Sequence, residues 1–170
     1  MIRVLSPAEA RAAVPALVDV LRDCVAGGAS VSFMADMSRA EAETFWVEVA
    51  DGVARGDRAL IVAEEAGRIV GTVQVIPAGK PNQPHRGDVA KMLVHRAARG
   101  RGVGAALMTA AEDEARRLGL TLLVLDTVPG TPAERLYRGR GFSFVGIVPG
   151  FALWPDGRPC DTAFFYKAIG

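Results

Sequence analysis

A glycine-rich segment with two arginines, Arg99-Gly100-Arg101-Gly102-Val103-Gly104, is the part of the chain best suited to bind an anion. It follows the apolar run 89–94 and opens a helical pattern from Ala105 to Leu118. Glycines at a helix start let the backbone approach a ligand closely. The first turn of a helix also carries unpaired N–H groups and a partial positive charge. The segment therefore predicts a cradle for a pyrophosphate group.

Two common nucleotide-binding motifs do not fit this segment. Gly100, Gly102 and Ala105 match the dinucleotide pattern G-x-G-x-x-[GA]. That pattern belongs directly after the first strand of a βαβ unit, whereas residues 95–99 separate these glycines from the apolar run. The P-loop pattern fails because no Gly-Lys-Ser/Thr follows. What remains is R-x-x-G-x-G, formed by Arg99, Gly102 and Gly104.

A second segment, Ala133-Glu134-Arg135-Leu136-Tyr137-Arg138-Gly139-Arg140-Gly141-Phe142, has the pattern A-x-x-L-Y-x-x-x-G-F. Together with segment 92–104 it resembles the GNAT acyltransferase superfamily, in which both segments occur in this order and separation. The resemblance in element order spans essentially the whole chain. It implies acetyl-coenzyme A (acetyl-CoA) as cofactor and transfer of its acetyl group to a primary amine.

Three further segments, 27–37, 123–127 and 149–158, are similar to the tabtoxin-resistance branch of that superfamily. That branch is associated with acetylation of the amino group of a β-lactam amino acid toxin. The resemblance therefore implies an amino-acid-like acceptor and a role in toxin or antibiotic resistance.

By the same resemblance, one set of residues would bind the cofactor. Segment 99–104 would hold the pyrophosphate, and backbone groups of Met92 and Val94 would bind the pantetheine arm like an added strand. Arg138 and Arg140 are candidates for the adenosine phosphates, or they form a solvated helix end. The expected cofactor contacts are Met92, Leu93, Val94, Arg99, Gly100, Arg101, Gly102, Val103, Gly104, Ala105, Tyr137 and Arg138.

Three side chains are candidates for proton transfer. The attacking amine must be neutral, and we assign Asp88 and Asp126 to hold its ammonium form and relay the proton. Asp88 begins the strand that leads to Val94, and Asp126 ends the next parallel strand, where sites of open α/β sheets gather. The alternative is that both aspartates cap a loop or turn. The resemblance implies that Tyr137 protonates the leaving thiolate, although tyrosines in helices commonly fill the core.

The segment 27–37 joins two predicted helices and mixes small, polar and apolar residues. The resemblance implies that it lines the amine pocket, with Trp154 either closing the far wall or lying in a hairpin turn. The expected substrate contacts are Ser30, Ser32, Phe33, Met34, Asp88, Asp126 and Trp154. Cys24 and Cys160 are alternative nucleophiles, but neither has a base partner in the sequence.

The elements around these residues predict one α/β (α+β) domain over residues 1–170. Capping boxes begin helices after Ser6, Ser38 and Thr131, and Pro15 is expected to kink or split the first helix. We expect a mixed central sheet, antiparallel at first, with a parallel pair from the unit 89–127. The expected helices span 7–25, 39–54, 102–118 and 132–138, and the strands 59–64, 69–76, 89–94, 121–127, 142–148 and 162–168. Pro149-Gly150 and the stretch 154–157 are expected to form turns. The resemblance adds a splayed parallel pair and helices on both faces.

The amino-acid composition limits the classes of molecule that the protein could bind. Half of the residues are apolar, which excludes a disordered chain, and the net charge of +1 favours neither nucleic acid nor an acidic membrane. No apolar run approaches the ~18 residues of a membrane span. The two cysteines, Cys24 and Cys160, have no paired spacing, which fits the cytoplasm and argues against a zinc site.

Several functions stay open at this point. The acceptor could be an aminoglycoside, a polyamine or a peptide amine instead of an amino acid, although polycationic acceptors usually need an acidic cleft and the chain has no acidic run. A non-catalytic acyl-CoA sensor is a different class, and the presence of Asp88, Asp126 and Tyr137 together argues against it. The resemblance also implies a homodimer, since many members of the superfamily dimerise.

Overall fold

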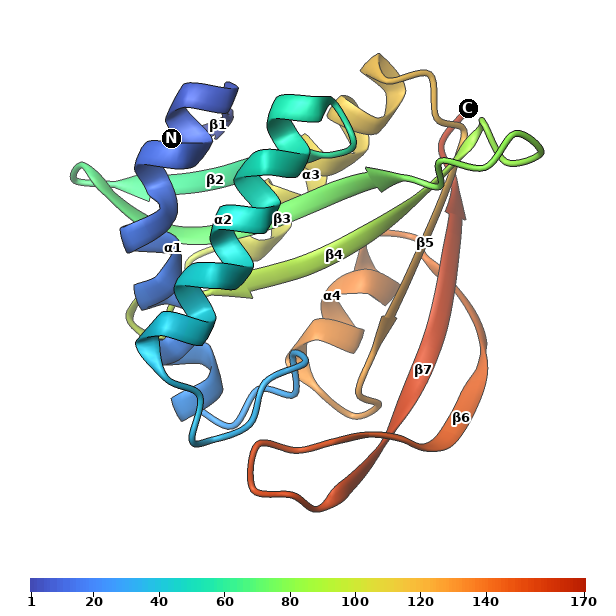
Figure 1. The fold of residues 1–170 in the computed structure, drawn as a ribbon. Helices are drawn as coiled ribbons and strands as arrows, with labels where there is room; N and C mark the ends of the chain where they lie inside the picture. Colours follow the sequence, from blue (N-terminus) through green and yellow to red (C-terminus); the bar gives the residue numbers. More distant parts are fainter.

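The computed structural model describes residues 1–170, and seven strands form one sheet in the order β1-β2-β3-β4-β5-β7-β6 (Figure 1). The elements are β1 (Ile2–Val4), α1 (Pro7–Ala26), α2 (Arg39–Arg55), β2 (Ala59–Glu65), β3 (Arg68–Pro77), β4 (Arg86–Val94), the 3-10 turn η1 (Arg96–Ala98), α3 (Val103–Arg117), β5 (Leu122–Thr127), α4 (Pro132–Gly139), β6 (Ser143–Leu153) and β7 (Pro159–Ala168). The predicted mixed sheet is confirmed.

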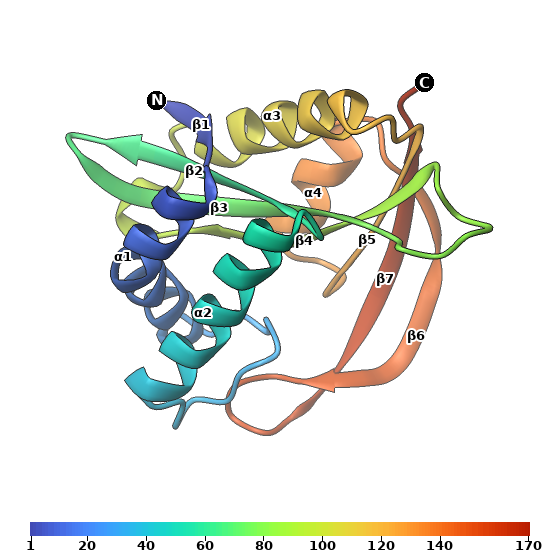
Figure 2. The same ribbon diagram turned by 45° about the horizontal axis from the view of Figure 1, so that its top comes forward.

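Helices cover both faces of the sheet, with α1 and α2 on one side and α3 and α4 on the other (Figure 2). Because side chains alternate along a strand, β2 serves both cores. Its Leu60 packs with α1 and α2, and the next residue, Ile61, packs with α3. None of the helices has both the length and the apolar character needed to cross a bilayer.

Helix starts follow the capping signals. The Ser6 hydroxyl accepts from the Glu9 N–H, and the Ser38 hydroxyl accepts from the Glu41 N–H. In both helices the glutamate carboxylate accepts in turn from the backbone N–H of the cap serine. The expected split at Pro15 does not occur, because α1 runs unbroken from Pro7 to Ala26.

Two strand predictions needed correction. β1 was not expected, since three residues are too few to show a period; it pairs antiparallel with β2. Pro149-Gly150 was expected to be a turn but lies within β6. This edge strand tolerates the proline because its pairing with β7 shifts between Val148 and Ala152, and the Gly150 N–H donates instead to Asp161 Oδ1 at 2.9 Å.

The two parallel strands, β4 and β5, are paired at one end only. β4 and β5 pair only where Arg86–Asp88 lies against Leu122–Val124, and beyond that point they diverge (Figure 1). On its other edge β4 has a bulge, where Val73 of β3 faces both Lys91 and Met92. A bulge bends the strand that carries the extra residue, and this one lies beyond the end of the pairing with β5.

Candidate active site

A cavity of about 1030 Å³ opens where β4 and β5 diverge. This is at the upper end of the range for sites that enclose a large ligand. Its walls come from the α1–α2 loop, β4, segment 98–105, the end of β5, α4, and the β6–β7 hairpin. Segments from both ends of the chain therefore meet around one opening.

One end of the cavity is lined with backbone amides. Gly100 and Gly102 have φ values of +74° and +80°, which favour glycine, and Gly102 caps α3 with no side-chain bond. The backbone N–H groups from Gly100 through Ala105 donate to no acceptor in the protein. Consecutive unpaired amides at a helix start can bind an anion.

Gly104 keeps this end of the cavity open. A Cβ at this position would lie 3.2 Å from Leu136 Cδ2, 3.8 Å from Met92 Sδ and 3.9 Å from Val94 Cγ2. The first turn of α3 therefore approaches α4 and β4 closely, and a methyl group would fill the space between them. Gly104 is favoured here because a side chain would contact α4 and β4, and not because its φ value requires glycine.

Tyr137 of α4 reaches the cavity from the same side. Its side chain is buried, its ring lies 6.0 Å from that of Phe142, and its hydroxyl makes no hydrogen bond within the protein. Burial, and to a lesser degree the Asp126 carboxylate, raises the pKa of this hydroxyl well above its ordinary value. Tyr137 is thus a protonated donor without a partner.

Asp126 lies at the end of β5, on the sheet face opposite that of the buried Leu125. Its Oδ2 accepts from the Thr162 hydroxyl at 2.7 Å, and Thr162 itself is buried on the adjacent β7. One carboxylate oxygen is held by the protein, while the side chain is exposed to the cavity. This arrangement can bind an ammonium group.

Asp88 does not line the cavity, contrary to expectation. It pairs with Val124 in the last β4–β5 pair, and Val124 precedes Asp126 by two residues on β5. Along the strand direction, Asp88 therefore lies about 7 Å before Asp126. Its Oδ1 accepts from Arg86 Nη1 at 2.7 Å. The structure therefore does not bring the two aspartates together, because the strands separate only beyond Asp88.

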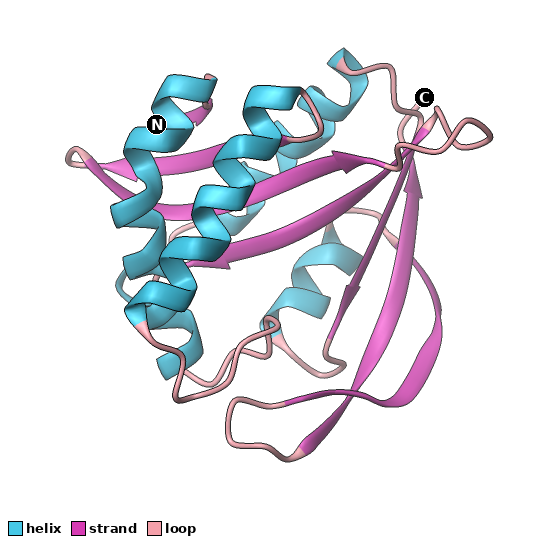
Figure 3. Cartoon of the chain, in the orientation of Figure 1, coloured by secondary structure: helices cyan, strands magenta, loops and turns pink.

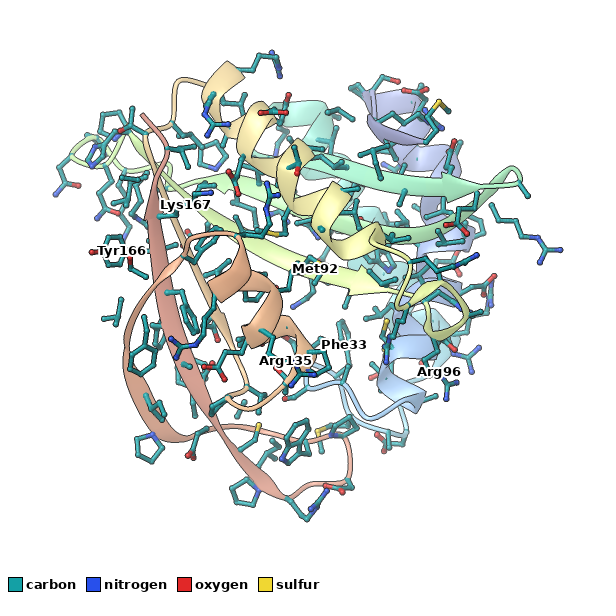
Figure 4. All side chains as sticks on the ribbon, turned by 180° about the vertical axis from the view of Figure 1, so that it is seen from behind. Phe33, Met92, Arg96, Arg135, Tyr166 and Lys167 are labelled. Carbon is teal, nitrogen blue, oxygen red and sulfur yellow. The ribbon has the colours of Figure 1, made fainter.

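Most of the other expected residues do line the cavity. They are Met92, Leu93, Val94, Arg99, Gly100, Gly102, Gly104 and Ala105 on the cofactor side, and Ser30, Ser32, Phe33, Met34 and Trp154 on the substrate side. In Figure 4, Met92 projects from β4 and Phe33 from the α1–α2 loop.

Four residues that were expected or considered as cofactor contacts do not line the cavity. Val103 is buried in the core, and Arg101 pairs with Glu65 at 2.7 Å. Arg138 pairs with Glu134 at 2.8 Å and lies over the rings of Phe144 and Phe165. Arg140 lies 3.6 Å from Glu112. Arg101, Arg138 and Arg140 are therefore paired within the protein and do not line the cavity.

The α1–α2 loop is held in place by the β6–β7 hairpin (Figure 3). The Ser30 hydroxyl donates to the Leu153 carbonyl at 2.7 Å, and the Ala35 N–H donates to the Pro155 carbonyl at 2.9 Å. These bonds join the loop to the hairpin, and the two segments contribute Phe33 and Trp154 to the cavity lining.

Sequence reasoning missed Lys91, which lines the cavity from the β4 bulge. Its Nζ donates to Ser32 Oγ at 2.9 Å and lies 5.7 Å from the centre of the Phe45 ring. Burial lowers the pKa of this ammonium, and the Asp126 carboxylate opposes that shift. The available signal was one charged residue inside the otherwise apolar run 89–94.

Cys24 also lines the cavity, but it does not have the properties of a nucleophile. Burial raises the pKa of its thiol. Its Sγ lies 3.5 Å from the Val94 carbonyl and 3.8 Å from Arg99 Nη2. A buried thiol of raised pKa is mostly unreactive.

Comparison with known proteins supports the family. The model of the acetyltransferase (GNAT) family matches residues 15–142. A curated protein named IAA acetyltransferase from Azospirillum brasilense is 35% identical over 92 residues, which cover 54% of this chain and 58% of that protein. The match thus spans little more than half the length of this curated relative.

Solved structures show the same fold across the whole chain. A ribosomal-protein-alanine N-acetyltransferase from Brucella melitensis is 25% identical with a TM-score of 0.81, covering 99% of both chains. A phosphinothricin acetyltransferase from Sinorhizobium meliloti in complex with acetyl-CoA is 21% identical with a TM-score of 0.81, covering 100% of this chain and 88% of that one. The comparisons support the superfamily and no particular branch of it.

Proposed function

The chain belongs to the acetyltransferase (GNAT) family, and on that premise we propose that it transfers an acetyl group from acetyl-CoA to a primary amine of a small molecule. We treat residues 1–170 as one N-acetyltransferase domain. The observation that carries the proposal is a single cavity with an amide-lined anion site at one end and both Tyr137 and Asp126 on its walls.

The residues present fit this cofactor. The unpaired N–H groups from Gly100 to Ala105 would hold its pyrophosphate. The space beside Gly104 would admit the pantetheine arm that is attached to the pyrophosphate. The edge of β4 that faces β5 has no strand partner beyond Asp88, so its backbone groups are free to pair with the pantetheine arm. When bound, the cofactor supplies an activated acyl group and a thiolate leaving group.

Asp126 and Tyr137 would carry the proton transfers. Asp126 would hold the ammonium form of the acceptor amine and relay its proton to water. Thr162 keeps that carboxylate in place. Tyr137, kept protonated by its raised pKa, would donate its hydroxyl hydrogen toward the leaving sulfur.

Within this class we propose an amino-acid-like acceptor, the first candidate being a β-lactam amino acid toxin of the tabtoxinine type, with toxin resistance as the role. Asp126 and Asp161 are the only carboxylates among the lining residues, and they are accompanied by Lys91 and Arg99. Such a balanced lining does not favour polycationic acceptors such as aminoglycosides or polyamines. Peptide amines are the alternative.

We also propose a cytoplasmic location and a homodimeric assembly. The location is supported by Cys24 and Cys160, which are both unpaired thiols. The dimer is proposed by analogy with other members of the family, and size-exclusion chromatography with light scattering tests it.

The test is to incubate the purified protein with acetyl-CoA and a panel of amines, and to follow release of free thiol and the mass of the acetylated product. Calorimetry measures cofactor binding separately. Tight cofactor binding without turnover on any amine would favour an acyl-CoA sensor. Absence of cofactor binding would overturn the proposal.

A further inference from the structure

Two strained residues meet in one hydrogen bond at the cavity wall. Ser32, Ala66 and Lys91 are the non-glycine residues with left-handed φ values, and Ala66 lies in the β2–β3 turn. The other two, with φ values of 79° and 48°, are joined by the bond from Lys91 Nζ to Ser32 Oγ. Strain in residues that carry a Cβ persists only where the surrounding structure enforces it, and it concentrates at functional sites.

The β4 bulge is what presents Lys91. Val73 faces an extra residue on β4, and Lys91 takes the left-handed conformation there. Bulges of this kind re-aim a side chain next to a site. Here the ammonium is brought to the α1–α2 loop and the Phe45 ring, at the end of the cavity that holds Phe33 and Trp154.

The Lys91 ammonium lacks a counterion in the protein. It is half-buried, and no carboxylate lies within 4 Å of it, although Asp126 faces the same cavity. Partly burying an ammonium is unfavourable unless an anion compensates it. Of its three N–H bonds, one is used by Ser32, and the Ser32 hydroxyl hydrogen remains free to donate. Two N–H bonds of Lys91 and the hydroxyl hydrogen of Ser32 therefore have no acceptor within the protein.

The cofactor's phosphates would not supply that anion. Their site, segment 100–105, adjoins Met92, Val94 and Leu136 on the α3–α4 face of the sheet. Lys91 instead contacts Phe45 of α2 and Ser32 of the α1–α2 loop, on the opposite face. An acceptor bound in the cavity can supply an anion to Lys91.

We propose that Lys91 and Ser32 bind the carboxylate of the acceptor while Asp126 binds its amino group, so that the acceptor is a small molecule carrying both, such as an α-amino acid. The inference rests on the proposed acetyl transfer and deepens it by naming the residues that would recognise the acceptor's carboxylate. Phe33, Met34 and Phe151 line the same end and suit an apolar side chain.

The test compares each acceptor with two analogues that lack the carboxylate. The panel holds the proteinogenic L-amino acids and phosphinothricin, each beside its carboxamide and its decarboxylated amine, for example L-methionine, L-methioninamide and 3-(methylsulfanyl)propylamine. The amide amine is less basic and the decarboxylated amine more basic than the amino acid. A preference for the amino acid over both therefore cannot arise from amine basicity.

We expect the wild-type protein to prefer the carboxylate-bearing member about 10- to 100-fold in kcat/KM, the range for a hydrogen-bonded ion pair. Lys91→Met should lower that ratio by a similar factor, and Lys91→Arg should retain part of it. Lys80→Met, the same change at an exposed lysine outside the cavity, is the matched control and should leave the ratio unaltered.

A second readout is independent of turnover. Calorimetric titration of the preferred amino acid into the protein with coenzyme A should give binding that is lost with the carboxamide. Ser32→Gly relieves the left-handed strain while removing the hydroxyl, so it should fold and still bind more weakly. Acetylation of amines without preference for a carboxylate, or an unchanged ratio in Lys91→Met, overturns the inference and leaves the proposed function standing. Cofactor binding with no acetylated amine overturns both.

Discussion

The Thr162 hydroxyl holds Oδ2 of Asp126 at 2.7 Å, so that a residue of β7 fixes the orientation of a carboxylate at the end of β5. Thr162 is buried and Asp126 faces the cavity. This bond is why we assign the acceptor amine to Asp126 and not to Asp88, whose carboxylate pairs with Arg86.

Asp126→Asn should lower kcat/KM by about 10²-fold or more, because the carboxylate that holds the ammonium and relays its proton to water is lost. Asp88→Asn should change it less than about threefold. Steady-state kinetics with the best acceptor checks both variants. Asp113→Asn on the exposed surface of α3 is the control. Equal losses in Asp88→Asn and Asp126→Asn would contradict the assignment.

Tyr137→Phe should lower kcat by about 10²-fold and change the cofactor dissociation constant little. The hydroxyl makes no bond in the protein, so its removal costs no internal contact, while the donor to the leaving sulfur disappears. Stopped-flow thiol release gives kcat, and calorimetry gives cofactor affinity. An unchanged kcat would exclude the acid role.

Tyr137 should also affect stability at alkaline pH. Its pKa is raised by burial, so the folded state retains the phenol proton that the unfolded state loses near pH 10. This contribution to stability is complete below about pH 10 and is lost as the pH rises through the folded pKa. Denaturant unfolding from pH 9 upward should therefore show a steeper loss of free energy for the wild type than for Tyr137→Phe. Parallel curves would contradict the assigned burial effect.

Gly104→Ala should weaken cofactor binding about tenfold or more without destabilising the fold. Alanine favours a helix over glycine, but its Cβ would lie 3.2 Å from Leu136 in the space beside the amide-lined end of the cavity. Calorimetry and thermal melting separate the two effects. Gly139→Ala, where a Cβ meets nothing within 4 Å, is the matched control and should leave binding intact.

Lys91→Met should raise the melting temperature by about 2–4 °C, equivalent to about 1 kcal/mol, because a half-buried ammonium without a counterion is removed. The pKa of Lys91 is lowered in the folded state, so the wild type regains stability as pH rises from that pKa toward about 10.4. The difference between the two proteins should be largest at neutral pH and vanish above about pH 10.4. A lower melting temperature for Lys91→Met at pH 7 would contradict this account.

The sequence predicts the helices and the paired strands well because their signals are local. Ser6 and Ser38 mark helix starts by their own hydrogen bonds, and strand alternation divides Leu60 and Ile61 between two cores. Segment 99–104 was recognised for the same reason, since the cradle consists of consecutive amides.

What the sequence does not predict depends on pairing between distant strands. Asp88 was expected in the site because the residue at which β4 and β5 part is not encoded locally. Lys91 was missed because its position depends on a bulge opposite Val73, nearly twenty residues earlier in the chain. Pro149 was predicted to lie in a turn, because only the pairing of β6 with β7 shows that this proline lies within an edge strand.

The bonds from Ser30 to Leu153 and from Ala35 to Pro155 make the two acceptor-end loops one unit, although more than a hundred residues separate them. The second loop lies beyond residue 142, where the match to the family ends, whereas segment 99–104 lies within it. On the proposed function, exchange of both loops together between relatives would change acceptor selectivity and leave the amide-lined end of the cavity unchanged. Exchange of one loop alone would remove the hydrogen bonds that hold the other loop.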